Sequence, residues 1–117
     1  MVYPWTISII LILGSSKFNG QCFIDSHDRV LGAAVKVDRS HMTIEKCIEF
    51  CSNDGYAFAG VESEDECYCG NNAPNQNLIA DSGCNSKCSG DQTQICGGHW
   101  KINIYSVDKK GIHLILY

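Results

Sequence analysis

Eight cysteines in a chain of 117 residues constrain the fold more than any other feature. Four of them lie in one stretch, residues 47–70, with the sequence CIEFCSNDGYAFAGVESEDECYCG. Cys47 and Cys51 have the spacing of neighbours on one helix face, and Cys67 and Cys69 have the spacing of neighbours on one strand face. The stretch therefore predicts a helix joined to a β-hairpin by disulfides, with each helical cysteine bonded to one strand cysteine.

The N-terminal residues indicate which chemistry these cysteines serve. An apolar run, residues 5–13 (WTISIILIL), precedes the small residues Gly14, Ser15 and Ser16, a pattern typical of a secretory leader cleaved after Ser16. A cut nearer Gly20 is the alternative, and an uncleaved anchor is disfavoured because a bilayer span needs roughly 20 apolar residues. Secretion favours disulfides over zinc ligation, and the Cys-x-x-Cys pairs of zinc sites are absent.

The predicted organisation is simple. Residues 1–16 form the signal peptide, residues 20–107 one domain, and residues 108–117 a tail too short to span a membrane. The net charge is −4, which gives no basic face for a nucleic-acid partner. We expect a secreted, extracellular domain without a membrane span in the mature chain.

The remaining cysteines leave the disulfide connectivity open, since eight cysteines allow many pairings. We call the predicted bridges between the helix (Cys47, Cys51) and the hairpin (Cys67, Cys69) the clamp. Two further bridges are expected among the other four cysteines, Cys22, Cys84, Cys88 and Cys96.

The helix is predicted to begin at Thr43, because a threonine hydroxyl can accept a hydrogen bond from an amide of the first turn. It is predicted to end at residues 53–55 (NDG), where Gly55 can adopt a left-handed conformation. Its buried stripe, at helical spacing, is Ile44, Cys47, Ile48 and Cys51.

The hairpin is predicted to pair residues 56–62 with residues 67–69 across a polar turn, 63–66. If Glu62 lies opposite Cys67, the face toward the helix carries Tyr56, Phe58, Cys67 and Cys69. The other face then carries Tyr68 with Ala57, Ala59 and Val61. A slip of one residue would reverse this assignment.

The flanking segments are less patterned. Residues 21–24 are predicted to form a first strand and residues 101–107 a last one, with Ile102, Ile104 and Ser106 on one side and Asn103, Tyr105 and Val107 on the other. Residues 25–38 are predicted to form a loop that packs Val30, Leu31 and Val35, with Arg29 and Lys36 in solvent. Residues 71–82 are expected to be a polar loop.

The motifs of this chain resemble those of the WSC domain, a cysteine-rich extracellular module. The similarity covers residues 20–107 and lies in Cys22-Phe23, Met42-Thr43-Ile44-Glu45-Lys46-Cys47, Cys51, Gly55-Tyr56, Ala59-Gly60-Val61-Glu62, Glu66-Cys67-Tyr68-Cys69-Gly70, Cys84, Cys88-Ser89-Gly90-Asp91, Gln94-Ile95-Cys96-Gly97-Gly98 and Tyr105-Ser106. The departures are Gln21 where glycine is common, Phe23 where tyrosine is usual, and His99-Trp100 after the double glycine.

The resemblance implies a small disulfide-rich α+β fold, with one main helix packed on a short antiparallel sheet as in PAN/apple domains. It also implies four disulfides and a carbohydrate-binding role, with a polysaccharide or a glycoprotein glycan as the partner. The alternative function is a protein-interaction or structural disulfide scaffold of a receptor-like extracellular protein.

A sugar site needs aromatic side chains with a polar handle and short polar groups. The candidates are Tyr68, Trp100, Asn71, Asn72 and Asp91. Each has a structural alternative: core packing for Tyr68, a cap over the disulfides for Trp100, a turn for Asp91 and plain loop for the two asparagines.

Catalysis has little support in the sequence. The histidines His27, His41, His99 and His113 are scattered and form no nucleophile or metal motif. The acidic run Glu62, Glu64, Asp65 and Glu66 is interpreted as a hairpin turn in water. We therefore expect no enzyme activity, no cofactor and no metal.

Overall fold

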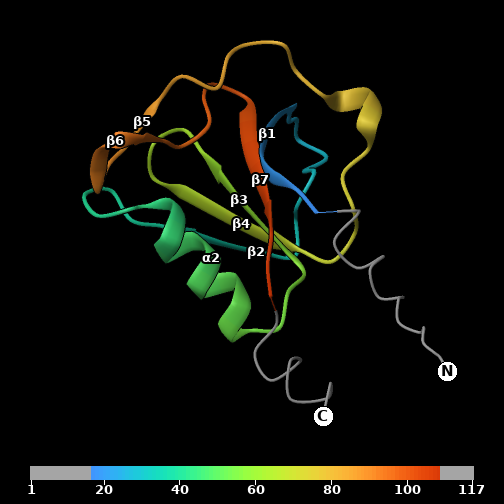
Figure 1. The fold of residues 1–117 in the computed structure, drawn as a ribbon, viewed down its shortest axis with the longest axis horizontal. Helices are drawn as coiled ribbons and strands as arrows, with labels where there is room; N and C mark the ends of the chain where they lie inside the picture. Colours follow the sequence, from blue (N-terminus) through green and yellow to red (C-terminus); the bar gives the residue numbers. More distant parts are fainter. Residues whose placement is uncertain (1–16, 109–117) are drawn as a thin grey trace, which may run out of the picture.

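The computed structural model describes residues 17–108, so the predicted leader and all of the predicted tail except Asp108 lie outside the described residues. The described chain forms a five-stranded antiparallel sheet in the order β1-β7-β3-β4-β2, with the helix α2 packed on it (Figure 1). Its strands are β1 (Asn19–Ile24), β2 (Ala34–Val37), β3 (Phe58–Glu62), β4 (Glu66–Gly70) and β7 (Lys101–Ser106). The predicted α+β fold is confirmed.

Smaller elements complete the domain. A two-stranded sheet consists of β5 (Lys87–Cys88) and β6 (Asp91–Ile95), and a short 3-10 helix, η1 (Gln76–Leu78), interrupts the long loop after β4. Within residues 17–108, no helix combines the length and apolar character needed to cross a bilayer.

The helix α2 (Ile44–Asn53) begins and ends where the sequence predicts. The Thr43 hydroxyl accepts a hydrogen bond from the Lys46 amide at 3.0 Å, which satisfies one free amide of the first turn. Gly55 follows the helix with a φ of +80°, a conformation that favours glycine. The Gln94 side chain donates to Glu45 at 2.8 Å and so ties the start of the helix to β6.

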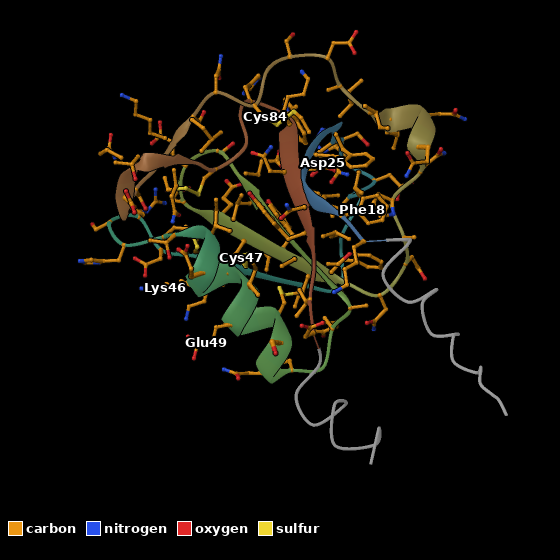
Figure 2. All side chains as sticks on the ribbon, in the orientation of Figure 1. Phe18, Asp25, Lys46, Cys47, Glu49 and Cys84 are labelled. Carbon is orange, nitrogen blue, oxygen red and sulfur yellow. A yellow bond between two sulfur atoms is a disulfide. The ribbon has the colours of Figure 1, made fainter. Side chains whose placement is uncertain are left out.

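All eight cysteines form disulfides, as predicted. The bridges are Cys47–Cys67, Cys51–Cys69, Cys22–Cys84 and Cys88–Cys96. The first two join α2 to β4, which confirms the predicted clamp (Figure 2). The Sγ atoms of Cys47, Cys51 and Cys67 lie within 4.8 Å of one another because the two bridges are adjacent. Their sulfurs are all in disulfides, so they offer no thiolate for a metal.

The predicted hairpin register is wrong by one residue. Glu62 pairs with Glu66, not with Cys67, so the cross-strand partner of Cys67 is Val61. The connection is a three-residue turn, in which Ser63 and Glu64 adopt φ values of +52° and +76°. Because side chains alternate along a strand, this shift moves every β3 side chain to the face opposite the predicted one.

The corrected register gives the two faces of the sheet different partners. On the helix side, Ala59 and Val61 pack with the four clamp cysteines, and Tyr56 packs against this cluster as predicted. Phe58, which was predicted to face the helix, packs instead with Tyr68 on the other face. The predicted faces of the last strand are confirmed, since Ile102 and Ile104 pack with Tyr68 and Val107 packs with the cysteines.

The segment 25–38 is not only a loop. Residues 34–37 form β2, which pairs with β4 at one margin of the sheet. Leu31 is buried as predicted, but Val35 is 56% exposed because it lies on the last strand, where no further element covers it. The polar residues around this short strand hid its alternation.

Candidate functional site

Arg29 lies on the sheet face that α2 leaves free, beside Tyr68 of β4 and near Glu62 at the end of β3. Its loop is closed by Asp25, whose Oδ1 accepts hydrogen bonds from the Ser26 and Val30 amides, both at 2.9 Å. Leu31 anchors the loop, since its side chain is 1% exposed and lies against Gly60 and Gly70. A Cβ on Gly70 would approach Leu31 Cδ2 to 3.1 Å, so the glycine makes room for this anchor.

The Arg29 guanidinium lies over two aromatic rings. Its central carbon is 4.9 Å from the centroid of the Tyr68 ring and 4.8 Å from that of the Trp100 ring. Both distances are within the range of cation–π attraction. Tyr68 comes from β4 and Trp100 from the turn before β7, so Arg29 joins two segments that are distant in the sequence.

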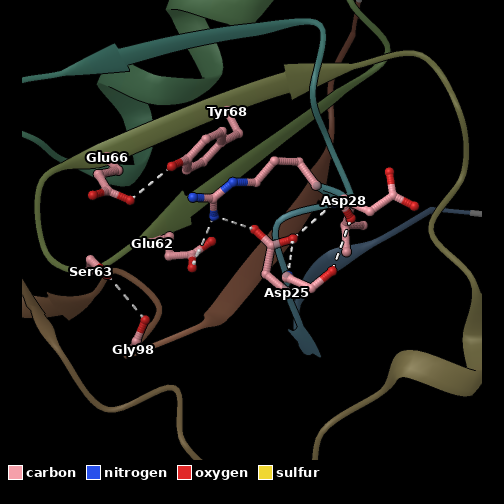
Figure 3. A network of polar contacts seen from close by, with 10 residues as sticks. Asp25, Asp28, Glu62, Ser63, Glu66, Tyr68 and Gly98 are labelled. Carbon is pink, nitrogen blue, oxygen red and sulfur yellow. Dashed lines mark hydrogen bonds and ion pairs between the residues drawn. The ribbon is translucent and has the colours of Figure 1, made fainter.

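Two buried carboxyl groups hold Arg29 in this place. Its Nη1 lies 3.0 Å from Asp25 Oδ2 and 3.6 Å from Glu62 Oε2 (Figure 3). Asp25 is 4% exposed and Glu62 is 2% exposed, whereas 30% of the Arg29 side chain remains accessible. A buried carboxylate is costly unless it is paired, and Arg29 supplies the positive charge of this cluster.

The two acids differ in their protonation. Burial and, after it, contact with the Asp25 carboxylate together raise the pKa of Glu62 to about 9, against the opposing effect of Arg29. Burial also opposes the charge on Asp25, but the hydrogen bonds that it accepts from Glu62, Val30 and Arg29 outweigh that effect and lower its pKa. At neutral pH, Glu62 is therefore the protonated partner that donates to ionised Asp25. Glu62 Oε1 is buried and has no hydrogen-bond partner among the described residues, so an ionised Glu62 would carry charge on an oxygen that no donor contacts.

A shallow pocket opens beside this network. Its volume is about 180 Å³, and Arg29, Glu62, Ser63, Glu66, His99 and Trp100 line it. Such a volume is well below the roughly 300–1,000 Å³ of pockets for drug-sized ligands. The pocket therefore suits one small ring or head group and not a long chain segment. Tyr68 does not line this pocket, but its hydroxyl donates to Glu66 Oε1 at 3.0 Å, which links its ring to the pocket lining.

Unusual backbone conformations gather around this pocket. Within residues 17–108, the only residues other than glycine with positive φ are Ser63, Glu64 and Trp100. Ser63 and Trp100 line the pocket, and Glu64 lies between Ser63 and the start of β4. For a bulky residue such as Trp100, a φ of +54° is strained. The Trp100 carbonyl accepts a hydrogen bond from the Asp25 amide at 3.0 Å, which ties it to the Arg29 loop.

The double glycine places Trp100 at this site. Gly97 has a φ of +65°, and its amide donates to Asn103 Oδ1 at 2.7 Å. A Cβ on Gly98 would overlap the carbonyl oxygen of Gly83, so only glycine allows this close approach. The chain can then return into β7 with Trp100 turned toward Arg29.

The structure brings together two of the five predicted site residues, Tyr68 and Trp100. Asn71 is exposed, and its Oδ1 accepts from the Ala57 amide at 2.9 Å, beyond the far end of β4. Asn72 is an exposed loop residue beside it. Asp91 lies on β6, where its Oδ1 accepts from the Thr93 amide at 2.9 Å, so it makes the turn that its residue type predicts.

Sequence reasoning missed the residues that join Tyr68 to Trp100. Arg29 was predicted to be solvated, and this is wrong because it lies over both rings. Glu62 was predicted to lie in a turn in water, and this is wrong because it ends β3 with only 2% exposure. The one available signal was the i, i+4 spacing of Asp25 and Arg29, which is too common to identify a site.

A larger hollow lies elsewhere on the same face. It has a volume of about 460 Å³ at the opposite end of β3 from Glu62, and aromatic side chains, Pro74 and Ile79 form most of its apolar lining. Among the residues that the structure describes, Lys17 is the only ionisable one that lines it. It offers apolar surface without the convergent polar groups of the Arg29 site.

Comparison with known proteins identifies the family. Residues 19–98 match the WSC domain. The chain is 40% identical over 86 residues to "Xylosyltransferase oxt" of Drosophila melanogaster, a match that covers 72% of this chain and 10% of that protein. It is 40% identical over 94 residues to a "WSC domain-containing protein" of Arthroderma benhamiae, covering 79% of this chain and 12% of that protein.

A third relative is "Kremen protein 1" of Homo sapiens, which is 44% identical over 66 residues, or 55% of this chain and 14% of that protein. The chain thus corresponds to a small part of each of these relatives. The match to the family spans the clamp, the Arg29 loop and the double glycine. This chain belongs to the WSC domain family.

Proposed function

We propose that this domain binds carbohydrate, without catalysis, through the pocket formed by Arg29, Glu66, His99 and Trp100. The observation that carries the proposal is the stack of Tyr68, Arg29 and Trp100 beside that pocket. Aromatic side chains with polar handles suit the mixed apolar and polar surface of a sugar. The family resemblance supports a glycan as the ligand.

The polar groups of the pocket also suit a sugar. Within residues 17–108, only Nη1 of the Arg29 guanidinium has a side-chain partner, so the other guanidinium donors remain for a ligand. Glu66 supplies a carboxylate acceptor whose other oxygen is not used by Tyr68. The strained Trp100 backbone supports the same assignment, because strain of this kind is concentrated at functional sites.

The relatives support the proposal to a limited extent. One is named as a xylosyltransferase, an enzyme that transfers a sugar, although the match covers 10% of it. The disulfides suit an oxidising, extracellular setting, which agrees with a secreted or cell-surface module. Asp25 and Glu62 both lie against the Arg29 guanidinium, at 3.0 Å and 3.6 Å, and this pairing favours a structural role for the two acids and binding over catalysis.

Screening of the domain on a glycan array and titration calorimetry with β-glucan, chitin, mannan and glycosaminoglycan oligosaccharides test the proposal. We expect one class to bind weakly as a single site and more tightly when the ligand is repeated. Trp100→Gly removes the ring while keeping a residue suited to positive φ, and it should abolish binding. Asn72→Ala, an exposed residue outside the pocket, should bind as the wild type does.

The proposal fails if no glycan binds a folded domain, or if folded Trp100→Gly binds as tightly as the wild type. Thermal unfolding of each variant separates loss of the site from loss of the fold. Incubation with the same oligosaccharides, followed by product analysis, tests the absence of catalysis, and any cleavage or transfer that Glu66→Gln abolishes would contradict it.

A further inference from the structure

The two edges of the main sheet are treated differently. Beyond β1, Ile79 forms a bridge to Phe23, and the Ala80 amide donates to the Cys22 carbonyl at 2.9 Å. The disulfide Cys22–Cys84 then fixes this covering segment. Beyond β2, no strand of the described residues 17–108 follows in the order of the sheet (Figure 1). An open edge is a template for pairing with another chain, so β2 is the edge to consider.

The pairing with β4 shows which backbone groups of β2 are free. Val37 is opposite Glu66 in the antiparallel ladder, and the Asp38 amide donates to the Asp65 carbonyl at 2.9 Å. In an antiparallel ladder, residues alternate between bonding the partner strand and pointing away from it. Lys36 and Asp38 therefore bond toward β4, and Val35 and Val37 direct their N–H and C=O groups to the open side. Outside the β2–β4 ladder, neither valine makes a backbone hydrogen bond within residues 17–108.

The side chains of this edge are apolar on one face and basic on the other. Val35 and Val37 are 56% and 50% exposed, on the same face as Tyr68. Lys36 lies on the helix face, with its Nζ 5.4 Å from the centroid of the Phe50 ring. A strand that added to this edge would place its apolar side chains beside the valines and the side chain between them beside Lys36.

We propose that the β2 edge binds an extended segment of another protein by strand addition, and that this segment carries an acidic residue between two apolar ones. Strand addition is an established mode of peptide recognition, in which main-chain bonds give affinity and alternate side chains give specificity. Here the acidic residue lies opposite Lys36, and the apolar residues extend the surface of Val35 and Val37.

A second copy of this chain fits the edge poorly. The Ala33 amide already donates to the Cys69 carbonyl, and residue 39 lies in the turn after β2. The register that uses both Val35 and Val37 in a two-fold pair therefore places Lys36 directly opposite the Lys36 of the other copy. Like charges directly opposite one another destabilise a strand pair, so the charge of this edge selects a non-identical, acidic strand.

The test uses residues 17–108 with all four disulfides intact. It is titrated with a synthetic heptapeptide, Thr-Thr-Val-Glu-Val-Thr-Thr, and with a matched peptide in which lysine replaces glutamate. We expect the glutamate peptide to shift the Val35 and Val37 amide resonances and to slow their hydrogen exchange. It should bind about twofold to fivefold more tightly than the lysine peptide, the range for one cross-strand charge pair.

Two variants test the mechanism. Lys36→Glu should reverse the order of the two affinities, so that the lysine peptide binds more tightly than the glutamate peptide. Val37→Pro should abolish binding without unfolding the sheet, because proline is tolerated where an edge N–H faces solvent, whereas Val37→Thr keeps the N–H and should still bind. Both valine variants can be checked for native disulfides and thermal unfolding.

Several results would overturn the proposal: no response of Val35 and Val37 to the glutamate peptide, equal binding of both peptides, or unchanged binding by Val37→Pro. A wild-type dimer in sedimentation that Val37→Pro dissociates would also overturn it, because the occupant would then be a second copy. Val37 lines neither the glycan pocket nor the hollow that Val35 shares with Arg29 and Tyr68, so the Val37→Pro result is independent of the glycan pocket.

Discussion

The two faces of the main sheet are stabilised by different chemistry. On one face, two disulfides join α2 to β4, and the cysteines involved are at most 1% exposed. On the other face, no disulfide crosses between the Arg29 loop and the sheet, and Arg29 is held by two aromatic rings and two acids. We call the face with the two disulfides the covalent face. Its bridges maintain the fold, which allows the other face to keep a buried charge cluster and a tryptophan with a strained backbone.

We first predict that the covalent face contributes most of the free energy of unfolding. A domain of about 90 residues buries limited apolar surface, and each disulfide contributes roughly 2–4 kcal/mol, against a total stability of about 5–15 kcal/mol. We expect excess reductant to unfold the domain cooperatively, as followed by far-UV circular dichroism. Native-like thermal unfolding of the fully reduced protein would show that the covalent face is not the dominant one.

The second prediction concerns the charge cluster. Arg29→Ala leaves Asp25 buried and ionised without its ion pair, and removal of one partner of a buried pair costs about 3–5 kcal/mol. Because 30% of the Arg29 side chain is accessible, we expect a loss near the lower end of that range. Arg39→Ala, whose side chain is 86% exposed, is the control and should change stability little. Equal denaturation midpoints in urea for the two variants would contradict the cluster's role.

The third prediction concerns the pH dependence of stability, which should come from the acids beside Arg29 and not from the covalent face. The folded-state pKa of Glu62, about 9, is above its usual value of 4.5, so the stability that its proton brings is complete below pH 4.5 and is lost as the pH rises through 9. The lowered pKa of Asp25 acts in the opposite direction, and its contribution is lost as the pH falls through the acid range. We expect the wild type to lose stability progressively from neutral to alkaline pH.

Glu62→Gln keeps a neutral side chain of the same shape and should flatten that alkaline loss. The measurement is the urea midpoint from pH 6 to pH 10. Glu64→Gln alters an exposed residue of the same turn and should keep the wild-type profile. A Glu62→Gln profile that parallels the wild type would show that Glu62 is already ionised in the fold.

The smallest expected loss of stability comes from a change at the start of α2, on the covalent face. Thr43→Ala removes the side-chain cap of α2 and should cost about 1 kcal/mol. Thr43→Ser keeps a capping hydroxyl and is the control. The urea midpoints of the two variants measure the difference. A loss from Thr43→Ala as large as that from Arg29→Ala would contradict this order, because the cap of α2 would then stabilise the domain as much as the charge cluster does.

The helix and its clamp were predictable because they rest on local spacing. Thr43 and Gly55 mark the ends of α2, and the positions of Cys47 and Cys51 fix which helix face is buried. The hairpin register was not predictable, because Ser63 and Glu64 adopt positive φ in a turn whose sequence carries no glycine. The same one-residue difference explains why the burial of Glu62 was not predicted, because the true register directs its side chain into the protein.

The site was only half predictable for a related reason. Tyr68 and Trp100 could be selected by residue type, but the sequence does not show that Arg29 joins them. Arg29 precedes Tyr68 by 39 positions and Trp100 by 71, and nothing local distinguishes it from a solvated arginine. The β2 edge was missed likewise, since a strand of four residues shows too little alternation.

The sequence alone determined the family, the disulfide clamp and the capped helix, because cysteine spacing and capping residues act over a few positions. Only the tertiary structure decided which face of the hairpin meets the helix, which acids share a proton, and which sheet edge stays open. Those properties depend on burial and on contacts between distant segments. A residue's charge, pKa and accessibility are set by its surroundings in space, and these are complete only when the chain has folded.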